Sequence, residues 1–149
     1  MTSFRFVIFV MLVAFAPALF ALEFGVRAGR YSDINKNFVG AELAFPLGRN
    51  VVLDPNIEYI LGNHGYNAGF GSVDLLYLFT GAIRPYLGAG VGEYRVSGHG
   101  FSDNTNVWNA IAGLDFRLGT LKPYGQVKYL RTTQHSYAHA TAFTVGLRF

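Results

Sequence analysis

Four histidines are the side chains in this sequence best suited to bind a metal ion or to change charge near neutral pH. They are His64, His99, His135 and His139, and all lie in polar segments between apolar ones. A zinc or copper site needs several ligands at suitable spacing, and only His135 and His139 lie four residues apart. The chain has no Cys, which excludes thiolate-bound zinc and iron–sulfur clusters. We therefore expect separate loop histidines, with no metal site and no cofactor.

A serine nucleophile with a histidine base is the second chemistry to consider. His135 and Ser136 are adjacent, and neighbouring residues of a strand point to opposite faces, so this base would not serve that hydroxyl. No Asp or Glu follows Asp115 to orient a late histidine. We expect a protein that is not an enzyme. The alternatives that stay open pair a histidine with a serine near one rim: His64 with Ser72, and His99 with Ser97 or Ser102.

Charged residues make up only 14% of the chain, yet they recur at alternate positions of otherwise apolar segments. Several would share the inner face of a barrel, as a lumen charge network of Arg27, Glu42, Asp54, Glu58, Asp74, Asp115, Arg117, Lys128 and Arg148. Buried charges need partners, and we expect cross-strand pairs of Arg27 with Glu42 and of Glu23 with Arg148. The alternative is a narrow polar path for ions, in the room left by Gly88, Gly90, Gly92, Gly113 and Gly146.

Strands are the elements that would position these residues, because apolar residues recur at every second position after residue 22. The breaks between the segments are alternately short and long, and the long ones are rich in Gly, Asn, Asp and His. This pattern predicts an all-β fold, a transmembrane eight-stranded antiparallel up-and-down β-barrel. The expected strands are 23–31, 37–47, 51–61, 70–80, 84–96, 105–118, 122–132 and 139–149.

The two faces of the expected strands distinguish a membrane barrel from a soluble one. One face of the last segment carries Phe143, Val145, Leu147 and Phe149, and the other carries Thr144, Gly146 and Arg148. A continuous apolar face and a charged opposite face indicate lipid outside and a polar interior. Pro55 lies on the outward face of segment 51–61, where it removes a ladder hydrogen bond, so we expect a bulge at Asp54 and Pro55.

The amino-terminal residues form a separate unit. A basic start, an unbroken apolar run over Phe6–Phe15 and small residues in Ala16–Ala21 predict a secretory signal peptide, residues 1–21, cleaved after Ala21 or alternatively Ala18. A retained membrane helix over Phe6–Leu22 is the other interpretation. Residues 22–149 would then form one exported domain. The 12 basic and 9 acidic residues form no basic cluster, so we expect no nucleic-acid partner.

Two segments resemble a known family. Ala142–Phe149 is similar to the terminal strand of bacterial outer-membrane barrels, which commonly ends in Phe. Arg84–Gly92 resembles the Pro-Tyr-x-Gly-x-Gly-x-Gly strand of small eight-stranded OmpA/OmpX-like and porin-like proteins, and Lys122–Gly125 is a weaker match. The resemblance implies the outer membrane of a Gram-negative bacterium, with Phe143 and Phe149 recognised by the barrel assembly machinery. The lipid A deacylase of this membrane would require a late His-x-Ser pair and a nearby acid, which this sequence lacks.

The expected function is therefore structural: a non-enzymatic, monomeric barrel with a plugged lumen, anchored in outer-membrane lipid. A narrow porin is the alternative, and an adhesin comes third because the outer loops look too short to project a binding sheet. Arg30, Arg95 and Arg131 lie on the outward face at the outer ends of their strands. We expect these guanidinium groups to contact lipopolysaccharide phosphates, and the alternative is simple solvation by water.

Overall fold

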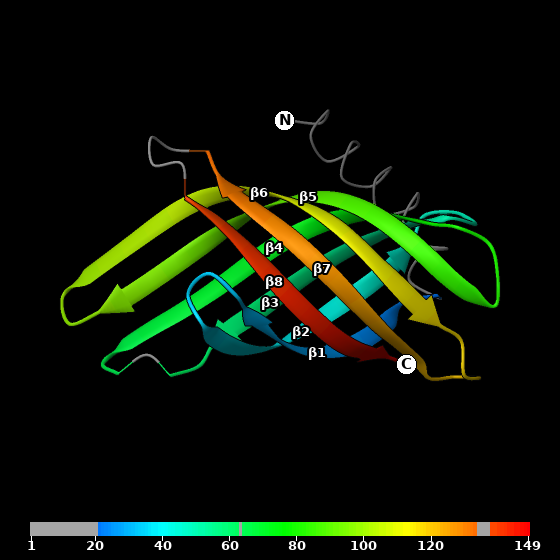
Figure 1. Ribbon diagram of the computed structural model, residues 1–149, viewed down its shortest axis with the longest axis horizontal. Helices are drawn as coiled ribbons and strands as arrows, with labels where there is room; N and C mark the ends of the chain where they lie inside the picture. The colour runs from blue at the N-terminus through cyan, green and yellow to red at the C-terminus, as the bar shows by residue number, and fades with distance from the viewer. Residues whose placement is uncertain (1–20, 63, 134–137) are drawn as a thin grey trace, which may run out of the picture.

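The computed structural model describes residues 21–62, 64–133 and 138–149, and within them the chain forms eight strands. They are β1 (Glu23–Tyr31), β2 (Lys36–Pro46), β3 (Val51–Ile60), β4 (Tyr66–Leu78), β5 (Ile83–Gly98), β6 (Phe101–Phe116), β7 (Lys122–Thr132) and β8 (His139–Arg148). Each strand pairs antiparallel with its neighbour in the chain, and β8 pairs with β1, so the sheet closes into a barrel (Figure 1). The fold class predicted from the sequence is confirmed.

Closure of the barrel depends on the two ends of the domain. Phe24 and Phe149 exchange backbone hydrogen bonds, with N···O distances of 3.1 and 2.9 Å. A closed sheet pairs the backbone groups that lipid cannot solvate. We call the end of the barrel with Glu23, Arg148 and the turns 47–50, 79–82 and 117–121 the terminal mouth, and the end with the turns 32–35, 61–65 and 99–100 the hairpin mouth.

The expected signal peptide and its alternative, a retained helix, fall almost entirely on residues 1–20, which lie outside the described residues. Among the residues described, there is no helix with the length and apolar character needed to cross a membrane.

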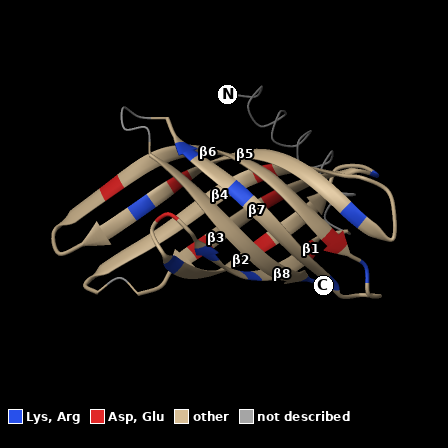
Figure 2. Ribbon diagram, viewed as in Figure 1, with Lys and Arg blue, Asp and Glu red and all other residues tan. Residues whose placement is uncertain are grey.

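Alternation along the strands separates an apolar exterior from a charged interior. Ile57, Val91 and Val145 are each 67% exposed on the outside, whereas Arg27, Asp74 and Lys128 are buried inside. Acidic and basic positions both occur along the strands through the body of the barrel (Figure 2). Burying charge while exposing large apolar side chains is stable only in lipid, so the expected orientation of the two faces is confirmed.

Pro55 does not produce the expected bulge. The register between β3 and β4 runs without a break through Asp54↔Asp74 and Pro55↔Val73. On the other side, the β2–β3 pairing lapses between Glu42↔Asn56 and Phe45↔Leu53 and resumes without an extra residue. Proline lacks only its own N–H, so a local gap in one ladder accommodates it and no residue is inserted.

The prediction of a loop over residues 97–104 is also wrong, because most of these residues belong to β5 and β6. β5 and β6 remain paired as far as Gly98↔Phe101, which leaves a turn at residues 99–100. The β6–β7 pairing ends at Val107↔Thr132, so the last part of this hairpin has a ladder to β5 but none to β7, and it projects at the left of Figure 1. The hairpin mouth therefore does project a sheet, because polar residues of the predicted loop continue the alternation of the strands.

Placing an arginine on the outer surface tests which positions lie within the membrane. Ile57 lies inside β3 and Leu118 lies in the turn 117–121, and both side chains are 67% exposed. Ile57→Arg should lower the free energy of unfolding by about 2–4 kcal/mol, and Leu118→Arg by about 0–1 kcal/mol, because only the first position lies at membrane depth. Urea unfolding of the barrel in phosphatidylcholine vesicles measures both. Equal losses would contradict the assigned depth.

Candidate functional site

The centre of the lumen is organised around Arg27, which lies among three carboxylates. Its Nε donates to Glu42 Oε2 at 2.7 Å, its Nη2 to Asp54 Oδ2 at 3.1 Å, and its Nη1 to Glu58 Oε1 at 3.2 Å. These side chains come from β1, β2 and β3 and are at most 1% exposed. Charge-assisted hydrogen bonds of this kind offset the free energy of removing the ions from water.

Arg148 lies on β8, the strand that closes the barrel against β1, and it contacts two of the same carboxylates. Its Nε donates to Glu42 Oε1 at 2.5 Å and its Nη2 to Asp54 Oδ2 at 3.4 Å. The Tyr124 hydroxyl donates to Glu42 Oε2 at 2.6 Å, and the Arg148 guanidinium lies 4.4 Å from the centroid of the Tyr124 ring. Glu42 is therefore held by two arginines and a phenol.

Lys128 of β7 forms the second centre of the network. Its Nζ lies 2.9 Å from Asp74 Oδ2 and 3.8 Å from Glu58 Oε1, and the side chain is 0% exposed. Asn109 donates to the other oxygen of Asp74 at 2.9 Å, and Asn56 donates to Oδ2 at 2.8 Å. Arg27, Glu42, Asp54, Glu58, Asp74, Lys128 and Arg148, which we call the charge network, thus form one connected set.

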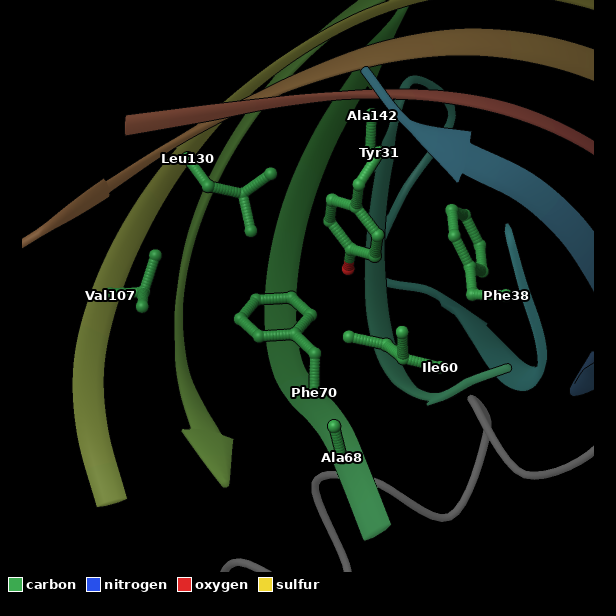
Figure 3. Close-up of a cluster of buried hydrophobic side chains, with 8 residues drawn as sticks. All are labelled: Tyr31, Phe38, Ile60, Ala68, Phe70, Val107, Leu130 and Ala142. Carbon is green, nitrogen blue, oxygen red and sulfur yellow. The ribbon is translucent and has the colours of Figure 1, made fainter. Parts of the chain in front are cut away.

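The charge network lies between two apolar layers. Along β4, Ala68 and Phe70 precede Ser72 and Asp74, and Leu76 and Leu78 follow. The hairpin-side layer packs side chains from several strands against one another (Figure 3): Tyr31, Phe38, Ile60, Ala68, Phe70, Val107, Leu130 and Ala142. The terminal-side layer consists of Val52, Leu76, Leu78, Tyr86, Ile111 and Tyr124.

The two apolar layers inside the barrel were not predicted from the sequence. The residues of the layers point inward, at the same alternate positions as the charges of the network. Near the strand ends, however, both the inward and the outward residues are apolar, so the sequence there shows no alternation of polar and apolar residues. A signal was present, since the inward positions of the segment 51–61 change from Asp54, Asn56 and Glu58 to Ile60 toward the hairpin mouth.

The inward glycines do not leave open space. A Cβ at Gly113 would lie 2.3 Å from the Tyr86 ring, and one at Gly146 would lie 2.2 Å from the Tyr124 ring. Gly88, Gly90 and Gly92 similarly face Leu76, Asp74 and Phe70 at 2.4, 2.0 and 2.8 Å. Each glycine accommodates a side chain of a neighbouring strand. The room that suggested an ion path is therefore filled.

Charges at the terminal mouth pair differently from the prediction. Arg148 reaches inward to Glu42 and Asp54, so the expected pair with Glu23 does not form, and Glu23 pairs with Lys122 of β7. Asp115 is buried and pairs with Arg84. Arg117 is exposed and lies outside the charge network, because it follows the end of β6 at the terminal mouth.

The outer arginines lie on three strands near the hairpin mouth and are exposed: Arg30, Arg95 and Arg131. Arg30 donates to Asn35 in the adjacent turn. Arg131 is paired in register with Trp108, whose ring contacts the Tyr129 ring with centroids 6.2 Å apart. Aromatic residues at this height are typical of a membrane–water interface.

The three histidines that the structure describes lie on separate elements. His64 and His99 lie in different turns, and His139 begins β8 and stacks on Tyr129. Within residues 21–62, 64–133 and 138–149, no three His, Cys, Asp or Glu side chains lie close enough together to hold a metal ion. His135 and Ser136 lie outside the described residues.

Neither histidine–serine alternative forms a pair. Ser72 is buried and donates to Asn56 at 3.1 Å, whereas His64 is exposed in the turn 61–65. His99, in the turn 99–100, makes no hydrogen bond with Ser97 or Ser102 in the described part of the chain.

The two terminal-strand phenylalanines are each 54% exposed on the outside of β8 and just beyond it. Phe143 is paired in register with Arg30 and Val127, and the Phe149 ring meets Phe24 at a centroid distance of 5.5 Å. Both rings are accessible from the lipid side.

No family model matches the sequence, and no curated protein does. The N-terminal β-barrel domain of Pseudomonas aeruginosa OprF matches with a TM-score of 0.69 and 17% identity, over 86% of this chain and 96% of that one. Neisserial surface protein A matches with 0.71 and 10%, over 85% and 95%. The outer membrane enzyme PagL matches with 0.60 and 15%, over 85% and 98%. At these identities the likeness shows the fold, that of the eight-stranded outer-membrane barrels, as the terminal Phe and the glycine motif indicated.

Removing one charge of the network tests its energetics. Lys128→Met leaves Asp74 without a cation and Glu58 with Arg27 alone, and it should lower the free energy of unfolding by about 3–5 kcal/mol. Lys122→Met is the matched control: Lys122 and its partner Glu23 are 23% and 24% exposed, so the loss should stay below about 1 kcal/mol.

Chemical denaturation in vesicles gives both values. The double variant Lys128→Met/Asp74→Asn should recover part of the stability, because no unpaired charge then remains at Asp74. Similar stability of the two single variants would contradict a dry, paired network.

Proposed function

We propose that this chain is a non-enzymatic integral protein of a bacterial outer membrane, with a sealed lumen and a structural, membrane-anchoring role. The observation that carries the proposal is the layered interior, in which a paired charge network is enclosed by apolar side chains at both ends. A protein with this interior offers its outer surface and its two mouths to partners, and no continuous polar passage to solutes.

Three features support a seal over a narrow porin. An eight-stranded barrel has an interior just wide enough for side chains to fill. The cations of the network are held by two or more carboxylates, so none is left to select or conduct ions: Arg27, Lys128 and Arg148. Four of the five inward glycines receive side chains of the apolar layers, and Gly90 receives Asp74 of the charge network, so the lumen at these positions is filled.

The proposed location rests on the apolar exterior, on the likeness to outer-membrane barrels and on the amino-terminal segment expected to act as a signal peptide. The exposed rings of Phe143 and Phe149 at the barrel seam are the positions we propose for contact with the assembly machinery. We further propose a monomer, since a closed barrel leaves no unpaired strand edge within the membrane.

A catalytic role has less support. Although PagL is an outer membrane enzyme with the same fold, a shared fold does not carry an activity. Among the described residues, His99 makes no hydrogen bond with Ser97 or Ser102, and Ser72 is buried and donates to Asn56 while His64 is exposed.

Electrical recording tests the seal. The mature chain, residues 22–149, in a planar bilayer should show no discrete conductance steps, because both apolar layers exclude hydrated ions. The triple variant Phe70→Ala/Tyr86→Ala/Tyr124→Ala removes rings from both layers and should conduct, which verifies that the assay detects an opened lumen. Reproducible steps from the wild-type barrel would establish the porin instead.

Lipopolysaccharide is the proposed partner of Arg30, Arg95 and Arg131. Guanidinium groups suit phosphate, and exposed cations near an anionic leaflet contribute about 1 kcal/mol each. Arg30 and Arg131 lie on the two strands that flank β8, so they can share one lipid, whereas Arg95 lies farther around the barrel.

Thermal unfolding with and without lipopolysaccharide should show stabilisation of the wild type that is reduced in the variant Arg30→Gln/Arg95→Gln/Arg131→Gln. Equal stabilisation of the two proteins would contradict lipopolysaccharide binding by these arginines.

A further inference from the structure

Arginine side chains converge on a small cavity at the terminal mouth. The cavity has a volume of about 140 Å³ and is lined by Arg49, Arg84, Arg117 and Arg148, together with Glu23 and Asp115. The arginines come from four places in the fold: the turn 47–50, the start of β5, the residue after β6 and the end of β8. Segments far apart in the sequence thus bring four arginines to the wall of one cavity.

The carboxylates at this mouth do not balance the arginines. Asp115 pairs with Arg84, Glu23 pairs with Lys122, and Arg148 is engaged by Glu42 and Asp54 of the charge network. Arg49 and Arg117 form no ion pair or hydrogen bond with the residues that the structure describes. Two exposed arginines that line the cavity therefore keep their guanidinium donors available, beside other cations that repel them.

Buried donors and acceptors at the wall are also unsatisfied. The Nε of Arg84 is buried and has no hydrogen-bond partner, although its Nη2 reaches Asp115. The Oδ1 of Asp115 is buried and likewise has no donor. A ligand that satisfies both must accept a hydrogen bond from a guanidinium and donate one to a carboxylate.

We propose that this cavity binds a phosphate group that retains a proton, either free phosphate or the end of a phosphomonoester. Its oxygens accept hydrogen bonds from Arg49, Arg84 and Arg117, and its P–OH donates to Asp115. A volume of about 140 Å³ takes a small oxyanion with little water, roughly the space of four to five water molecules. Planar guanidinium groups bind such oxyanions with two parallel hydrogen bonds each.

Calorimetry on the barrel in phosphatidylcholine nanodiscs, in a phosphate-free buffer of low ionic strength, tests the site. Inorganic phosphate should bind saturably with one site per barrel, and Arg49→Gln/Arg117→Gln should weaken binding at least tenfold. Both residues are exposed, so this variant should fold like the wild type. The control is Lys36→Gln, which removes a cation near the hairpin mouth and should leave the affinity unchanged.

Three further measurements complete the test. Sulfate, which carries no proton at neutral pH, should bind at least tenfold more weakly than phosphate, and glycerol 3-phosphate binding would identify a phosphomonoester ligand as opposed to free phosphate alone. The Nε–H resonance of Arg84 should shift on phosphate addition. Absence of saturable binding, equal binding of sulfate, or equal weakening in Lys36→Gln and in Arg49→Gln/Arg117→Gln would overturn the proposal.

Discussion

Lipid solvates neither a charged side chain nor an unpaired peptide group, and this constraint determines the arrangement of the whole chain. Closure between β1 and β8 pairs the backbone, and the alternation of the strands sends apolar side chains outward. The charged residues within the membrane have one remaining place, the lumen. There they stay ionised only as partners of one another, so Arg27, Lys128 and Arg148 each contact more than one carboxylate.

The same constraint explains the layers. A paired network is strongest where water is excluded, since a low local dielectric strengthens each contact. The hairpin-side and terminal-side apolar layers supply that exclusion, and the glycines opposite Tyr86 and Tyr124 let the rings cross the lumen. The surfaces that remain available for contact with partners are those that stay in water: the outward arginines, the projecting β5–β6 hairpin and the arginine-lined terminal mouth.

Strand number, face orientation and the inward direction of most charges were predictable from the sequence, because they depend on a period of two. Partners were less predictable. Glu23 meets Lys122, and Arg148 meets Glu42, because strand register and side-chain length act across the barrel. The gap in β2–β3 pairing beside Pro55 and the extension of β5 and β6 were also not predictable. Both depend on which backbone N–H and C=O groups pair with an adjacent strand. The inward glycines show the same limit of sequence-based prediction. Whether the space beside a glycine is open depends on the side chains of the neighbouring strands, which the sequence of its own strand does not reveal.

Exchange of the Lys128 ammonium protons with water tests the sealed network most directly. Lys128 is 0% exposed and lies between the apolar layers, whereas Lys122 is 23% exposed at the terminal mouth. Nitrogen-15 side-chain NMR of the barrel in nanodiscs should therefore resolve a slowly exchanging Lys128 ammonium signal and a rapidly exchanging one from Lys122. Exchange at Lys128 as fast as at Lys122 would mean that water reaches the network and that the lumen is not sealed.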